Sequence, residues 1–110
     1  MKFIQKNIND VIVGYIDGEI NLQTVPYLRS VLDKLSETDN DRVILNFLKV
    51  GYIDSMGIAA IIAFVQKREK LGKKTGISNI QPKIFSIFRI TKLDKVLNIF
   101  DSEEDALKSL

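Results

Sequence analysis

The sequence has 110 residues, a length typical of one small domain, so we expect a single domain over residues 1–110. It contains no cysteine and no histidine, which excludes disulfides, Cys/His zinc sites, thiol nucleophiles and Ser-His-Asp triads. Its 16 basic and 14 acidic residues leave a net charge of only +2, so a nucleic-acid-binding surface is not expected.

The longest apolar run, residues 58–65, is much shorter than the about 20 residues of a membrane-spanning helix. The first residues also lack the charged and then apolar pattern of a signal peptide. We therefore expect a cytoplasmic protein without membrane insertion. We expect no metal and no cofactor, and no catalysis by this chain.

Two short apolar segments near the N-terminus predict a pair of strands. Residues 11–16 are β-branched and aromatic, and Phe3 and Ile4 predict a partner strand. Asn9 and Asp10 between them favour a tight turn, so the pair should be antiparallel.

A helix is expected to begin at Thr24, a favourable N-cap, with Pro26 in its first turn. Apolar residues follow at helical spacing up to Leu35, and the polar face consists of Arg29, Asp33, Lys34 and Glu37. Residues 43–48 are almost continuously apolar, which is typical of a central strand that is covered on both faces.

The second half of the chain predicts alternating helices and strands. A helix is expected over residues 56–70 with a buried first half, ended by Gly72. Its basic end and the residues after it should be solvated: Lys67, Arg68, Lys70, Lys73 and Lys74.

Weaker signals complete the chain. Residues 75–80 and 96–100 predict short strands, and a short helix should begin at Pro82. Residues 102–105 have the form of a capping box that opens a terminal helix, with an apolar face of Ala106, Leu107 and Leu110. Strands that alternate with helices after a hairpin predict an α/β domain with a mostly parallel sheet, because parallel neighbours need crossover connections.

Function in such folds concentrates where strands end and helices begin, which directs attention to Asp54 and Ser55. One interpretation is that either residue only caps the following helix. The other is that Ser55 accepts a phosphate, since a helix N-terminus favours negative charge. The added charge would act on a small apolar patch formed by Met56, Gly57 and Ile58, and so would switch a partner surface.

Two other serine chemistries are less compatible with this turn. A nucleophile elbow needs Gly-x-Ser-x-Gly, but Ile53 occupies the place of the first glycine and no histidine is present to activate Ser55. Acyl carrier proteins attach pantetheine at a similar Asp-Ser pair. They are acidic helical bundles, however, and here the pair follows a strand in a basic chain.

Five motifs in order give the chain a resemblance to STAS domains of the bacterial anti-sigma factor antagonist type. They are Gly18-Glu19-Ile20-Asn21, the apolar strand at residues 43–47, Asp54-Ser55-Met56-Gly57-Ile58, Leu93-Asp94-Lys95-Val96 and the acidic terminal helix at residues 103–107. The resemblance implies a single STAS-like α/β domain with a mostly parallel sheet, an antiparallel N-terminal edge strand and roughly four helices.

The resemblance also implies a partner-switching role. The unmodified protein would bind an anti-sigma factor, itself a serine kinase, and so release the sigma factor. The kinase would use its own bound ATP to phosphorylate Ser55 and end the binding, and a PP2C-type phosphatase would reset it. The partner-binding residues implied are Asn21, Thr24, Asp54, Met56, Gly57 and Ile58.

Two residues depart from the family pattern. Asn21 stands where an aspartate is usual, so a carboxylate is lost there, and the residue is equally compatible with a simple turn. Met56 replaces a second hydroxyl residue and offers a flexible apolar contact or core packing. The alternative function is a structural STAS subunit of a transporter or signalling assembly, in which Ser55 is never phosphorylated.

Overall fold

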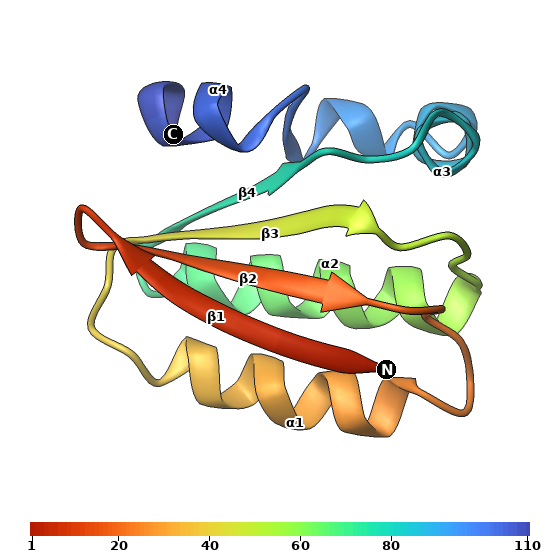
Figure 1. The fold of residues 1–110 in the computed structure, drawn as a ribbon, viewed down its shortest axis with the longest axis horizontal. Coiled ribbons are helices and arrows are strands. Elements are labelled where there is room, and N and C mark those ends of the chain that lie inside the picture. Colours follow the sequence, from red (N-terminus) through yellow and green to blue (C-terminus); the bar gives the residue numbers. More distant parts are fainter.

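A five-stranded sheet forms the centre of the molecule, as a computed structural model of all 110 residues shows (Figure 1). The strands lie across the sheet in chain order: β1 (Lys2–Ile8), β2 (Val11–Asp17), β3 (Arg42–Lys49), β4 (Lys74–Ser78) and β5 (Asn98–Phe100). β1 pairs antiparallel with β2, and every other pair is parallel. The predicted sheet is confirmed, with the apolar β3 at its centre.

The hairpin between β1 and β2 depends on two residues with left-handed backbone. Asn9 and Asp10 have φ of 51° and 66°. A two-residue hairpin turn needs positive φ at both of its central residues if its twist is to match that of the two strands. The side chain of Asn7 accepts a hydrogen bond from the Asp10 amide at 3.1 Å. The turn sets the register in which Ile8 lies opposite Val11.

Four α-helices connect or follow the strands: α1 (Val25–Ser36), α2 (Ser55–Lys70), α3 (Pro82–Ile90) and α4 (Glu103–Ser109). Their starts lie within one residue of the predicted ones. The last strand is shorter than expected, because Leu93–Lys95 forms a 3-10 turn and Val96, which is 67% exposed, lies outside the sheet. β4 ends before Asn79, whose φ of 59° breaks the extended backbone.

The two faces of the sheet are covered unequally. Helices α1, α2 and α3 bury one face in a cluster that includes Ile12, Leu45 and Phe47, and Phe47 packs edge-to-face on Phe88 at 6.4 Å. Figure 1 shows α1 and α2 side by side on this face. On the other face, α4 covers only a small cluster of Val11, Val13 and Ile44 around Ala106.

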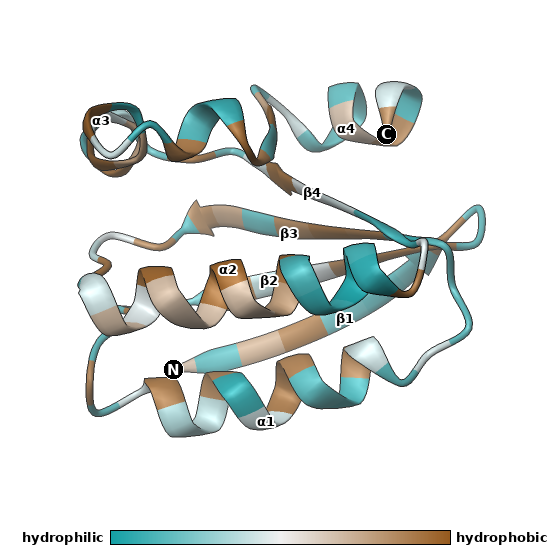
Figure 2. Cartoon of the chain, turned by 180° about the vertical axis from the view of Figure 1, so that it is seen from behind, coloured by the Kyte–Doolittle hydropathy of each residue, from teal (hydrophilic) through white to brown (hydrophobic).

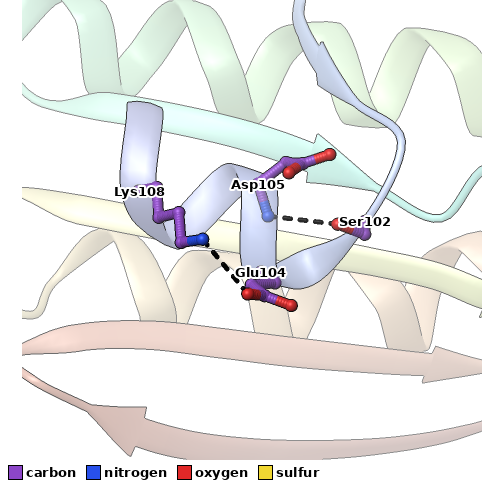
Figure 3. A network of polar contacts seen from close by, with 4 residues as sticks. All are labelled: Ser102, Glu104, Asp105 and Lys108. Atoms are coloured by element: carbon purple, nitrogen blue, oxygen red, sulfur yellow. Dashed lines mark hydrogen bonds and ion pairs between the residues drawn. The ribbon is translucent and has the colours of Figure 1, made fainter.

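The terminal helix α4 has the predicted cap. The Asp105 amide donates to Ser102 Oγ at 3.1 Å, and Glu104 and Lys108 form an exposed ion pair one turn apart at 3.2 Å (Figure 3). α4 packs against β3, β4 and β5 and also over Val11 and Val13 of β2, so most of β1, including Ile4 and Lys6, stays exposed on this face.

The prediction for Arg68 was wrong. Figure 2 shows the last turns of α2 as hydrophilic, and Lys67 and Lys70 are indeed exposed, but Arg68 is fully buried. Its Nε donates to Thr75 Oγ1 at 2.9 Å and its Nη2 donates to backbone carbonyls, including that of Lys74 at 3.1 Å. The reason is helical geometry, since Arg68 lies one turn beyond Phe64 on the face that packs on the sheet.

Candidate functional site

The turn singled out in the sequence lies at the carboxyl end of β3, where the chain enters α2. It is held against the loop that follows β2. Ile20 and Ile53 form a parallel bridge, in which the Ile20 amide donates to the Tyr52 carbonyl at 2.9 Å and the Asp54 amide donates to the Ile20 carbonyl at 3.0 Å. The two loops therefore act as one rigid support for the start of α2.

Asp54 is the residue that caps α2. Its Oδ1 accepts from the Gly57 amide at 3.0 Å, and its Oδ2 accepts from the Leu22 amide at 3.1 Å. One carboxylate thus satisfies a free amide of the helix and ties the β2–α1 loop to it. Of the two candidate caps in the sequence, Asp54 takes the role.

The side chain of Ser55 therefore does not cap α2. It is the first residue of the 16-residue α2, its side chain is exposed, and its hydroxyl forms no hydrogen bond within the chain. The N-terminus of a helix carries partial positive charge. A phosphate on Ser55 would meet this partial positive charge but also the carboxylate of Asp54 next to it, and it would have space in the solvent.

Gly57 lies where α2 packs closely against the two loops. It is buried, and a Cβ there would lie 2.4 Å from Ile20 Cγ2 and 2.8 Å from Ile53 Cγ1. Only glycine lets α2 approach the two loops this closely. Ile58 is half-buried and packs against the main core, so these two residues position the turn from its inner side.

Asn21 and Thr24 are joined by reciprocal hydrogen bonds. The Thr24 amide donates to Asn21 Oδ1 at 3.1 Å, and the Asn21 amide donates to Thr24 Oγ1 at 2.9 Å. Thr24 directly precedes α1, as predicted, but its side chain does not cap the helix. Asn21 caps an earlier turn, because its side chain reaches the amides of Gln23 and Thr24 before α1 begins.

Exposed apolar side chains come from both loops that support Ser55. Met56 is 43% exposed, although the first half of this helix was expected to be buried, and Leu22 and Tyr52 are exposed by 67% and 49%. We call Leu22, Tyr52, Ser55 and Met56 the Ser55 surface. Leu22 and Tyr52 could not be predicted from the sequence, since each is a single apolar residue in a polar loop and only the paired loops bring them to one place. The Ser55 surface is a largely apolar contact area with one aliphatic hydroxyl, that of Ser55, and the phenol of Tyr52.

Comparison with known proteins decides the family. Residues 3–106 match the STAS domain family, which is nearly the whole chain. The chain is a STAS domain protein. It is related to bacterial anti-sigma factor antagonists: it is 25% identical over 89 residues to the anti-sigma-B factor antagonist of Staphylococcus aureus (strain NCTC 8325 / PS 47), which covers 81% of this chain and 82% of that protein.

Two solved structures share the fold of this STAS domain protein. An anti-sigma factor antagonist from Mycobacterium paratuberculosis superposes with a TM-score of 0.88 at 23% identity, covering 98% of this chain and 92% of that one. A sulfate transporter family protein from Wolinella succinogenes gives a TM-score of 0.78 at 25% identity, covering 90% of this chain and 83% of that one.

The described STAS domain offers no group of three or more acidic side chains that could hold a metal ion. None of its helices has both the length and the apolar character needed to cross a bilayer. STAS domain proteins of the anti-sigma antagonist group are typically not enzymes.

Proposed function

We propose that this STAS domain protein is an anti-sigma factor antagonist whose binding is switched off by phosphorylation of Ser55. The observation that carries the proposal is the exposed, unbonded Ser55 hydroxyl at the first position of α2, beside an Asp54 that has already taken the capping role. A serine used for capping would be partly withdrawn from reaction, and Ser55 is not.

In the proposed cycle, the unmodified Ser55 surface binds an anti-sigma factor that is also a serine kinase. The apolar side chains of Leu22, Tyr52 and Met56 supply contact area that is buried on binding. The kinase then directs Ser55 Oγ to the γ-phosphorus of ATP. A bond forms to that phosphorus, ADP leaves, and the hydroxyl proton passes to a base of the kinase. A PP2C-type phosphatase hydrolyses the phosphate and restores the binding form.

The charge of one phosphate is large enough to change the affinity for the partner substantially. A phosphate adds about −1.5 to −2 charges at neutral pH. Leaving an unpaired charge in a desolvated interface costs about 2 to 5 kcal/mol, which is roughly 30-fold to several thousand-fold in affinity. One phosphate on the Ser55 surface is therefore sufficient to release the partner.

Incubation with the anti-sigma factor kinase of the same organism and ATP tests the proposal. We expect one added phosphoryl group, assigned to Ser55 by mass spectrometry of the digested protein, and none on the Ser55→Ala variant. If the kinase binds the chain in the presence of ATP and leaves Ser55 unmodified, the proposal is wrong.

The second candidate function is a structural STAS subunit of a transporter or a signalling assembly. It is favoured by the likeness to the sulfate transporter family protein from Wolinella succinogenes. In that case Ser55 only begins α2, and Ser55→Ala and Ser55→Asp should bind the assembly with equal affinity. The switch predicts that the Ser55→Asp variant binds its partner more weakly than Ser55→Ala.

A further inference from the structure

A cavity of about 200 Å³ lies on the sheet face opposite α1 and α2. Its apolar walls come from three neighbouring strands: Ile4 on β1, Tyr15 on β2 and Leu48 on β3. Ile4 and Leu48 are 59% and 58% exposed. We call this cavity the β1–β3 groove. It exists because α4 covers Val11, Val13 and Ile44 of the same face and reaches only as far as Asn46, whose Nδ2 donates to Glu103 Oε1 at 3.1 Å, so that Ile4 and Leu48 stay exposed.

The groove has a basic rim. Lys2 and Lys6 extend from β1 on one side and Lys49 from the end of β3 on the other, and all three are exposed. Asp17, the register partner of both Lys2 and Lys49, is the only carboxylate in the lining. Neighbouring strands lie about 4.8 Å apart, so the two basic sides are separated by roughly 10 Å, with Tyr15 and Asp17 of β2 between them.

We propose that the β1–β3 groove is a second docking surface, for an acidic segment of a partner protein. The segment inserts one large apolar side chain between Ile4 and Leu48 and places carboxylates beside Lys6 and Lys49. Charge complementarity selects the segment, and burial of the apolar side chain supplies most of the affinity.

Three features favour this occupant over others. The cavity is smaller than the about 300–1,000 Å³ pockets that enclose free small molecules, but it suits one anchoring side chain. A two-fold contact with a second copy would place the lysines of one rim against those of the other. An alternative role for the β1 lysines is to prevent β1, an edge strand, from pairing with the edge of another sheet. That role would not explain the exposed apolar groove beside them.

The groove is separate from the Ser55 surface. α2 packs on the face that carries Phe47, whereas Leu48 in the groove points to the opposite face, since neighbouring strand residues alternate. A partner in the groove can therefore stay bound while the Ser55 surface binds and releases another protein. The proposal does not depend on phosphorylation of Ser55.

The test is an NMR titration of the isotope-labelled full chain with a synthetic heptapeptide, in which a central phenylalanine is flanked on each side by two glutamates. We expect the amide signals of Ile4, Tyr15 and Leu48 to shift at up to mM peptide, with little change at Ser55. A matched peptide with lysines in place of glutamates should leave the spectrum unchanged.

Charge-reversed variants make the test specific. The double variant Lys6→Glu/Lys49→Glu should bind the acidic peptide at least about tenfold more weakly than the natural chain does. Higher salt should also weaken the binding of this peptide to the natural chain. Lys83→Glu, an exposed charge reversal on α3 outside the groove, should bind as the natural chain does.

Three outcomes would overturn the proposal. They are shifts that avoid the groove or are absent at mM peptide, equal loss of binding in Lys83→Glu, and sedimentation that shows a dimer which the double variant abolishes. The last would assign the groove to a second copy of the chain.

Discussion

Arg68 is the largest fully buried side chain, and it joins the end of α2 to the start of β4. We expect Arg68→Ala to lower the free energy of unfolding by about 3 kcal/mol, because the buried Thr75 hydroxyl and three partly buried carbonyls lose a charged donor at once. Urea denaturation measures the change. Lys67→Ala, one residue earlier and exposed, should stay within about 0.5 kcal/mol of the natural chain. Equal effects of the two substitutions would contradict this role of Arg68.

Tyr15 gives the protein a pH dependence in the alkaline range. Burial, aided by a hydrogen bond to Glu103 and by the negative charge of Glu103, raises the pKa of Tyr15 from 10.0 to about 12. The folded state therefore holds the phenol proton more tightly than the unfolded state. The stabilisation is complete below pH 10 and is lost as the pH rises through about 12.

Tyr15→Phe isolates this effect. Between about pH 9 and about pH 11, the free energy of unfolding of the natural chain should fall more steeply than that of the variant, since the variant has no phenol to titrate at this position. Urea denaturation at the two pH values gives the comparison. Parallel losses in the two proteins would show that Tyr15 does not contribute.

At the scale of elements, the contact between α2 and the two paired loops depends on Gly57. Gly57→Ala gains about 1 kcal/mol of helix propensity, but its Cβ would lie 2.4 Å from Ile20. Overpacking of this kind costs about 1 to 3 kcal/mol, so we expect net destabilisation and a displaced Ser55 turn.

Gly51→Ala is the matched control for Gly57→Ala, because no atom lies within 4 Å of a Cβ at that position. It should unfold within about 0.5 kcal/mol of the natural chain in the same urea series. If Gly57→Ala is as stable as Gly51→Ala, α2 does not need the close approach.

The elements that the sequence predicted well are those decided by local chemistry. Asn9 and Asp10 favour the hairpin turn, Pro82 starts α3, and Ser102 caps α4, each through its own backbone or side chain. The errors fall where distant residues decide. Arg68 belongs to the buried stripe of α2 by its spacing, but its charge suggested the solvent. Its burial is favourable because the Thr75 hydroxyl and three backbone carbonyls accept its hydrogen bonds.

Across the whole molecule, some residues of the candidate site are adjacent in the chain, and others are brought together only by the fold. Asp54 and Ser55 are adjacent in the chain, so their place at a helix start could be predicted from the sequence. Leu22 could not, because the hydrogen bond that brings it to Asp54 spans 32 residues. The β1–β3 groove likewise needs three strands and a short α4 before it exists, and no single segment indicates it.

One phosphate also changes the net charge of the whole molecule. The chain carries a net charge of only +2, so a phosphate of about −2 cancels it, and the Ser55 surface on which it lies is otherwise uncharged. Ser109→Asp provides a control for charge alone, because it adds an acidic group at the exposed end of α4. It should leave partner binding unchanged.

The decisive measurement for a switch at Ser55 is the affinity of the anti-sigma factor kinase for this chain, determined by calorimetry before and after phosphorylation of Ser55. We expect phosphorylation to weaken binding by at least about 30-fold, with Ser55→Ala binding as the unmodified chain does and Ser55→Asp binding more weakly. Equal affinities of the phosphorylated and unmodified forms would rule out a switch at Ser55.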